Sequence, residues 1–275
     1  MFIGTAIPIS RHSVWLVVLA VLGLLTRFAP AAPAQPAYSF SNSLAQADVA
    51  CQRGDLKFAL ELYARAQTLE ATNAPHLCAV TKCYCDLMHD RTNSALQPEL
   101  ARRALTAALQ AIQADPFSVT SHLCAAICYA KNFPFVDLRT KIAYSRGIKT
   151  EAEKALALDP HPDIAYYLLG RWHTGVANMG FFARGIVKVV YGGLPHASNA
   201  EAIACFQKAI AISPNRIIHH AGLARAYAAA GDTALAHQEL ETCRRLKPVD
   251  QDDADARQFA LAALASWPRP IPDSL

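Results

Sequence analysis

The stretch from Leu168 to Ser198 carries the residue types that most often do chemistry in proteins. Arg171, Trp172 and His173 stand in a row, and two further cations, a pair of phenylalanines and a Gly-Gly dipeptide follow. A histidine can act as a general base, and an arginine can hold a carboxylate or phosphate with two parallel hydrogen bonds. The stretch could instead be a membrane-binding element or a repeat with an insertion. The secondary structure expected around this stretch distinguishes between these interpretations.

The rest of the chain contains no established catalytic or ligand-binding motif. We find no nucleophile elbow, phosphate-binding glycine loop, zinc-protease motif or calcium-binding loop. The ten histidines are scattered, and the eight cysteines follow no zinc-binding spacing. We therefore expect a protein without enzymatic activity, catalytic residues, cofactor or metal site. The cysteines are expected to be buried between helices, and one or two disulfide bonds between neighbouring helices remain an alternative.

The first 34 residues have the order of a secretory signal peptide. Arg11 and His12 precede an apolar run from Val14 to Leu25, and small residues then continue to Ala34. The apolar run is too short to span a bilayer as a helix. We expect cleavage after Ala34, with retention as a membrane anchor as the alternative. Either outcome predicts an exported protein of the periplasm or cell envelope.

The charge of the chain disfavours nucleic acid as a partner. The formal net charge is +4, and removal of the signal segment takes away Arg11 and Arg27, which brings the remaining chain close to neutral. Proteins that bind nucleic acid usually carry a concentrated basic face. We therefore expect no nucleic-acid partner.

After Ser39 the chain reads as helices throughout, and its prolines mark a repeat. Proline disfavours helix in the residue before it, so each proline that follows an apolar segment indicates a helix end. The prolines that do so are Pro116, Pro160, Pro214 and Pro248. Small residues recur five positions before them, at Ala111, Ala155, Ala209 and Cys243, and ten positions after the first three, at Ala126, Gly170 and Ala224. Small residues in register let antiparallel helices approach closely, as in stacked helical hairpins.

The repeat has the features of the tetratricopeptide type. Pro214 and Pro248 are 34 residues apart, which is the tetratricopeptide period. We predict an all-α fold, a tetratricopeptide-type α-solenoid of about five helical hairpins over residues 41–264, followed by a proline-rich tail at 265–275. The longer intervals elsewhere place insertions in the turns, and the largest lies at 179–198 in the fourth hairpin.

The insertion predicts an amphipathic helix from Phe181 to Tyr191. At about 100° per residue its apolar side chains form a broad arc, and its two cations share the other side. Such a helix could lie on a membrane or line a lipid cavity, but it could equally bury its arc on the hairpins, which we favour. The residues that would bind lipid or membrane are Phe181, Phe182, Arg184, Ile186, Lys188 and Val190.

The concave face of the solenoid is the other candidate site. Arg171 and Arg225 each lie eleven residues after a repeat proline, so they occupy equivalent places on successive first helices. Two guanidinium groups could together hold a carboxylate or phosphate, although each arginine could equally be solvated or salt-bridged. With Lys131 and Tyr167 they form the predicted partner-binding surface. Trp172 and His173 are expected to pack between helices.

Three runs carry a family resemblance: EAEKALALDPHPDIAYYLLGRWH, VVYGGLPHASNAEAIACFQKAI and GDTALAHQELETCRRL. They resemble the regulator of microtubule dynamics family, including its bacterial relatives. The resemblance implies a helical tetratricopeptide-type domain that acts through binding, without enzymatic activity. Animal members are associated with microtubules and mitochondrial membranes, and one uses this kind of domain for phospholipid binding and transfer.

Our leading hypothesis from sequence is an exported scaffold or adaptor that binds a protein partner through Arg171 and Arg225. The first alternative is a lipid-binding or membrane-associated protein that uses the insertion at 180–191, with a phospholipid or membrane surface as partner. The second alternative, implied by the resemblance, is a microtubule-associated regulator.

Overall fold

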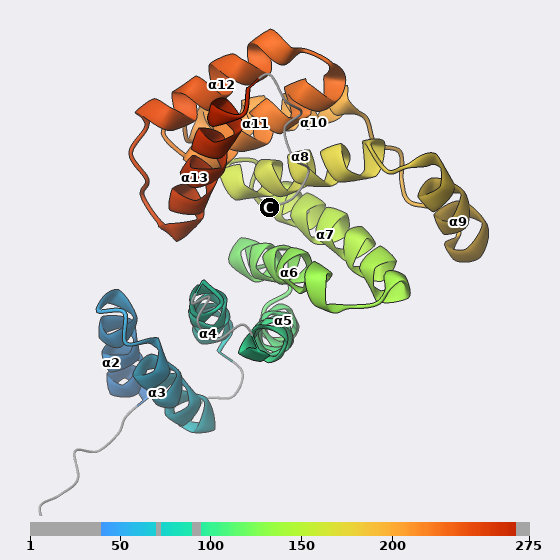
Figure 1. Cartoon of the computed structure of the whole chain (residues 1–275). Coiled ribbons are helices and arrows are strands. Elements are labelled where there is room, and N and C mark those ends of the chain that lie inside the picture. The colour runs from blue at the N-terminus through green and yellow to red at the C-terminus, as the bar shows by residue number, and fades with distance from the viewer. Residues whose placement is uncertain (1–39, 70–72, 90–94, 268–275) are drawn as a thin grey trace, which may run out of the picture. The chain divides into compact units, whose positions relative to one another are not determined.

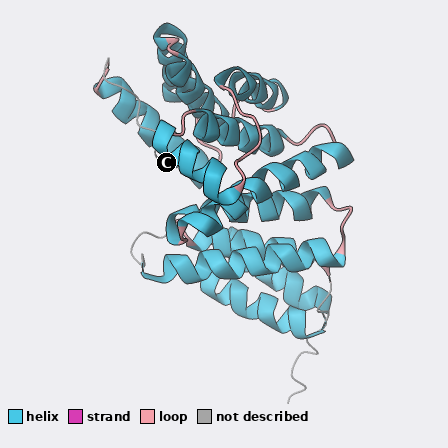
Figure 2. Cartoon of the chain, turned by 90° about the vertical axis from the view of Figure 1, so that its right-hand side faces the viewer, coloured by secondary structure: helices cyan, strands magenta, loops and turns pink. Residues whose placement is uncertain are grey.

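The computed structural model describes residues 40–69, 73–89 and 95–267 of the 275-residue chain. The expected signal segment at 1–34 and the expected tail at 265–275, except for its first three residues, lie outside these residues. Within the described ranges the regular structure is helical, and no strand is present (Figure 2). None of these helices combines the length and apolar character needed to cross a membrane.

Ten of the helices form five consecutive hairpins (Figure 1). The pairs are α2 (Phe40–Gln52) with α3 (Leu56–Leu69), α4 (Ala74–Leu87) with α5 (Gln97–Ala114), α6 (Val119–Asn132) with α7 (Leu138–Leu158), α8 (Asp163–Ala177) with α10 (Asn199–Ile212), and α11 (Ile217–Ala230) with α12 (Thr233–Arg245). A short 3-10 helix, η3 (Phe133–Phe135), joins α6 to α7. The insertion helix α9 (Phe181–Tyr191) lies between α8 and α10, and α13 (Gln251–Ala265) follows the last hairpin. This arrangement confirms the predicted fold class and the predicted insertion helix.

The turns follow from local sequence chemistry. The helices α5, α7 and α10 each end two residues before a repeat proline, which cannot continue a helix. After Pro116, Ser118 caps α6: its hydroxyl accepts from the backbone N–H of Ser121 at 3.2 Å. Gly231 ends α11 with φ of +91°, a left-handed conformation that favours glycine.

The core has the close helix packing that the register of small residues predicted. Ala111, Ala155, Ala209 and Cys243 are all fully buried. Phe206 of α10 fills the space that two glycines leave open: a Cβ atom would lie 2.9 Å from its ring at Gly170 and 2.3 Å at Gly222. The lack of a side chain at these two positions therefore lets α8 and α11 accommodate the phenylalanine.

The first helices of successive hairpins form one continuous layer. α4 contacts α6, α6 contacts α8, α8 contacts α11, and α11 in turn contacts α13. Each second helix packs against its own first helix and against the first helix of the next hairpin. Any groove on the layer of first helices is therefore lined by residues from several repeats.

Candidate functional site

The insertion helix α9 exposes most of its apolar arc, contrary to the burial that we favoured from sequence. Phe181 and Val189 are each 85% exposed, and Phe182 is 84% exposed. Ile186 and Val190 are also exposed, and Val187 is the arc residue that is buried. The expectation of burial was wrong because α9 touches the hairpins along one narrow edge instead of across its apolar face.

Two arginines hold the ends of α9 through backbone carbonyls. At its C-terminus, Arg146 of α7 donates from Nη2 to the carbonyl of Tyr191 at 2.5 Å and to that of Gly193 at 2.7 Å. At the other end, Arg184 of α9 itself donates to the carbonyl of Ala177 at 2.6 Å. These charge-assisted hydrogen bonds attach α9 without burying its apolar side chains.

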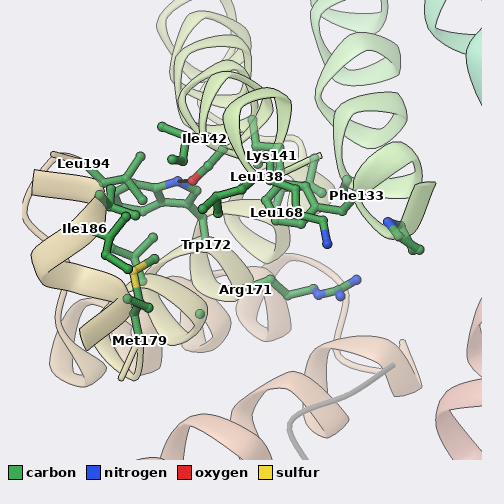
Figure 3. A pocket seen from close by; sticks show the side chains of 18 residues that line it. Phe133, Leu138, Lys141, Ile142, Leu168, Arg171, Trp172, Met179, Ile186 and Leu194 are labelled. Atoms are coloured by element: carbon green, nitrogen blue, oxygen red, sulfur yellow. Dashed lines mark hydrogen bonds between the residues drawn. The ribbon is translucent and has the colours of Figure 1, made fainter. Parts of the chain in front are cut away.

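A cavity of about 580 Å³ lies between α6, α7, α8 and α9, and we call it the α9 pocket (Figure 3). Its size is within the range typical of sites for small molecules. The apolar side chains that line it include Leu138, Ile142, Ile148, Leu168, Trp172, Val176, Met179, Ile186, Val187 and Leu194. The cationic residues of its lining are Lys141 and Arg171. Figure 3 shows the Arg171 side chain pointing away from α9.

Trp172 forms a fixed part of the wall of this pocket. Its indole Nε1 donates to the hydroxyl of Ser145 at 3.0 Å, and the ammonium of Lys149 lies 5.5 Å from its ring centroid. The neighbouring His173 is buried, which lowers the pKa of its imidazole, and its Nδ1 lies 3.4 Å from Glu201. Both residues pack between helices, as expected from their repeat position.

The arginine pair predicted for the concave face does not form an open anion clamp. The guanidinium of Arg225 lies 3.7 Å from the ring centroid of Phe259, which belongs to α13. Tyr167 is buried against Phe206 and His219. Arg171 is exposed, lies over the Tyr167 ring and lines the α9 pocket. Phe259 of α13, a helix that the repeat pattern did not separate, covers Arg225, and binding of a partner by these residues stays a prediction.

The fourth residue of the predicted surface, Lys131, lines a second cavity. This inner groove has a volume of about 680 Å³ and is lined by residues of α4, α6, the start of α8 and the N-terminal end of α13. The ammonium of Lys131 lies 3.8 Å from Asp252 of α13, and His89 lies 3.5 Å from the same carboxylate. A carboxylate of α13 therefore lies against both Lys131 and His89 in this groove.

A buried carboxylate anchors α13 to the hairpins. Asp253 is fully buried, and its Oδ1 accepts from the backbone N–H of Ile218 at 3.0 Å and lies 3.4 Å from Nε of Arg216. Sequence reasoning missed this contact, although Asp250 followed by two further acids is a typical helix start. Because α13 caps the N-terminus of α11, it is an integral part of the fold.

A family model described as regulator of microtubule dynamics protein 1-3 matches residues 43–267. The chain belongs to this family. Regulator of microtubule dynamics protein 1 of Pongo abelii is 28% identical over 173 residues, which cover 62% of this chain and 54% of that protein. The Homo sapiens protein of the same name is 30% identical over 125 residues, which cover 46% of this chain and 40% of that protein. The chain spans about half the length of the curated relatives it matches.

Solved structures confirm the tetratricopeptide-type fold. A thermophilic TPR protein of Thermus thermophilus aligns with a TM-score of 0.57 and 17% identity, over 82% of this chain and 100% of that one. MamA from Desulfovibrio magneticus aligns with a TM-score of 0.50 and 15% identity, over 84% of this chain and 97% of that one. At such identities the likeness concerns the fold alone.

Proposed function

We propose that this family member is a non-enzymatic lipid-binding protein that takes an acyl chain into the α9 pocket. The observation that carries the proposal is the apolar cavity of about 580 Å³ beside a helix whose apolar side chains are exposed. Burial of an acyl chain is favourable by about 0.8 kcal/mol per methylene group. A pocket lined by leucine, isoleucine, valine and tryptophan provides the matching surface.

Charged residues near the pocket suit an anionic head group. Lys141 and Arg171 are part of the pocket lining and can hold a phosphate through charge-assisted hydrogen bonds. Arg184 and Lys188 of α9 are exposed and add positive charge near the apolar arc. Basic residues on an amphipathic helix favour a membrane surface that contains anionic lipid.

The exposed arc of α9 supports a role in collecting the lipid from a membrane. Phe181, Phe182 and Val190 would enter the boundary between head groups and acyl chains, with the pocket directly beneath α9. Location in the periplasm or cell envelope is part of this proposal, and the composition of residues 1–34 supports it.

The test combines native mass spectrometry of the purified protein with flotation on vesicles of phosphatidylglycerol or phosphatidylcholine. Co-purified lipid and preferential flotation with the anionic vesicles are expected. Ala183→Trp places a large ring on a pocket-lining position of α9 and should remove most of the bound lipid. Ala143→Trp is the matched control, because Ala143 is exposed on α7 and does not line the pocket. The proposal would be refuted if the purified protein carries no lipid and floats with neither kind of vesicle.

A second candidate function is binding of a protein segment in the inner groove. The contacts of Lys131 and His89 with Asp252 favour it, because an acidic segment of a partner could take the place of that carboxylate. Crosslinking in the native cell envelope should recover a discrete partner, and Lys131→Glu should lose that partner while Lys154→Glu keeps it. Co-sedimentation with polymerised tubulin tests separately the activity for which the relatives are named.

A further inference from the structure

Four cysteines of α4 and α6 face one another in two pairs. On α4, Cys78 and Cys85 are seven residues apart, and on α6, Cys124 and Cys128 are four residues apart. Both spacings place the two thiols of a helix on the same side. The two helices pack against each other in the layer of first helices (Figure 1). The four thiols therefore lie along one helix contact.

The pairing is specific. Cys124 packs against the buried cluster that contains Cys78, and the two thiols are close enough for Cys124 to lower the pKa of Cys78. Cys128 likewise lowers the pKa of Cys85. Cys85 and Cys128 also belong to one buried apolar cluster. In contrast, Cys83 lies in a different cluster, with Leu62 and Tyr63 of α3. Cysteines that pack together across two helices meet the first requirement for a disulfide bond, which is proximity.

We propose that the pairs Cys78–Cys124 and Cys85–Cys128 are oxidised to two disulfide bonds that join α4 to α6. Each bond closes a loop that contains all of α5, so the two bonds link the second hairpin covalently to the third. They also hold together two of the helices that line the inner groove. The proposal is independent of lipid binding in the α9 pocket.

The oxidant is a disulfide of a small thiol or of a dithiol oxidase. The thiolate of Cys78 attacks one sulfur of this disulfide, the S–S bond of the oxidant breaks, and the leaving thiolate takes the proton that Cys78 lost. Cys124 then loses its proton and attacks the sulfur of Cys78, and the second oxidant sulfur leaves with that proton. Two cysteine thiols are oxidised to one disulfide, and one oxidant disulfide is reduced to two thiols.

The surroundings of Cys78 and Cys85 suit the first step, in which a thiolate attacks the oxidant. The side chains of Cys124 and Ser121 lower the pKa of the Cys78 thiol to about 7 despite its burial, which favours the thiolate form that attacks the oxidant. The hydrogen bond with Cys128 likewise lowers the pKa of Cys85. Cys78, Cys85 and Cys124 line the inner groove, through which an oxidant can reach them.

The experiment uses the full chain, purified in reductant and then treated with oxidised glutathione. Free thiols are alkylated after unfolding, and peptides are mapped by mass spectrometry without reduction. Trypsin cleaves at Lys82 and so separates Cys78 from Cys85. We expect both α4 peptides to be linked to the α6 peptide, Cys205 and Cys243 to be alkylated, and the oxidised chain to unfold at a higher temperature than the reduced chain.

Variants assign each bond. Cys124→Ser should lose the bond to Cys78 and keep the other, and Cys85→Ser should lose the bond to Cys128. Cys83→Ser is the matched control, since it lies on the same tryptic peptide as Cys85 and should keep both bonds. Four thiols that stay alkylatable after oxidation, or bonds that involve Cys83 or Cys205, would overturn the proposal. Peptide mapping of the wild-type chain decides this even if a variant fails to fold.

Discussion

His220 connects three parts of the fifth hairpin through its two ring nitrogens. Its Nδ1 lies 2.7 Å from the carboxylate of Glu239 on α12, and its Nε2 lies 2.9 Å from the carbonyl of Pro214 in the preceding turn. Both partners can only accept hydrogen bonds, so the imidazolium form, which donates from both nitrogens, satisfies them together. The imidazole therefore binds the turn, the first helix and the second helix to one another.

The same position recurs in two earlier repeats. His122 also lies six residues after its repeat proline, and it makes the equivalent contacts with the carbonyl of Pro116 at 2.9 Å and with Glu151 at 2.5 Å. In the repeat between them, the hydroxyl of Tyr166 donates to the carbonyl of Pro160 at 3.2 Å. A polar ring at this position is thus a structural element of the repeat.

The contribution of His220 to the stability of the protein should fall as the pH rises through neutrality. Burial lowers the pKa of His220, but the hydrogen bonds to Glu239 and Pro214 outweigh it and raise the pKa above the ordinary value. A raised folded-state pKa means that the contribution is complete below the unfolded value of about 6.5 and is lost as the pH passes the folded-state value. Urea unfolding at a series of pH values measures this loss.

Glu239→Gln should reduce this pH dependence and lower the free energy of unfolding by about 1.5–3 kcal/mol at the acidic end of the series. His161→Gln is the control, because His161 is exposed and its partner Asp159 lies two residues away in the same turn. An unchanged pH profile in Glu239→Gln would show that His220 does not carry the effect.

Gly222→Ala should destabilise the protein by about 1–3 kcal/mol, because the new Cβ would lie 2.3 Å from the Phe206 ring and force this buried side chain to move. Gly175→Ala is the matched control: it also lies inside a helix, but no atom lies within 4 Å of the place that its methyl group would take. Gly175→Ala should leave the free energy of unfolding unchanged or raise it by up to about 1 kcal/mol. Equal effects in thermal unfolding would contradict the packing that we describe around Phe206.

Asp253→Ala should destabilise the protein by about 3–5 kcal/mol, since it removes a buried carboxylate from Arg216 and from the backbone N–H of Ile218. Hydrogen exchange should show loss of protection in α13 and at the N-terminus of α11. The neighbouring variant Asp252→Asn changes a half-exposed carboxylate and should have little effect on stability. Similar losses in the two variants would argue against the anchoring role of Asp253.

Arg146→Ala should release the C-terminal end of α9, because it removes two hydrogen bonds to the carbonyls of Tyr191 and Gly193. Trypsin should then cleave faster at Arg184 and Lys188, which are exposed on α9. Arg139→Ala, at an exposed position near the start of α7, serves as the comparison. Cleavage at an unchanged rate would show that α9 is held by contacts other than Arg146.

The sequence by itself determined the helical repeat and the helix in its largest insertion. Proline positions, small residues in register and the amphipathic phase of residues 181–191 are local or periodic signals, and each reflects the backbone preferences or packing of a single hairpin. The same signals placed Gly170 and Trp172 in the packing of α8. They could not show which faces of neighbouring elements remain open, because that depends on contacts between distant residues.

Only the tertiary structure decided what covers Arg225, what α9 leaves exposed and which cysteines meet. Phe259 reaches Arg225 because α13 packs on α11, and no spacing in the sequence links these two residues. The α9 pocket exists because α9 is attached by its ends, where the side chains of two arginines donate hydrogen bonds to backbone carbonyls. Cys78 meets Cys124 because α4 packs directly on α6 although α5 separates them in the chain. Such long-range contacts arise from the way the hairpins stack, which local periodicity does not encode.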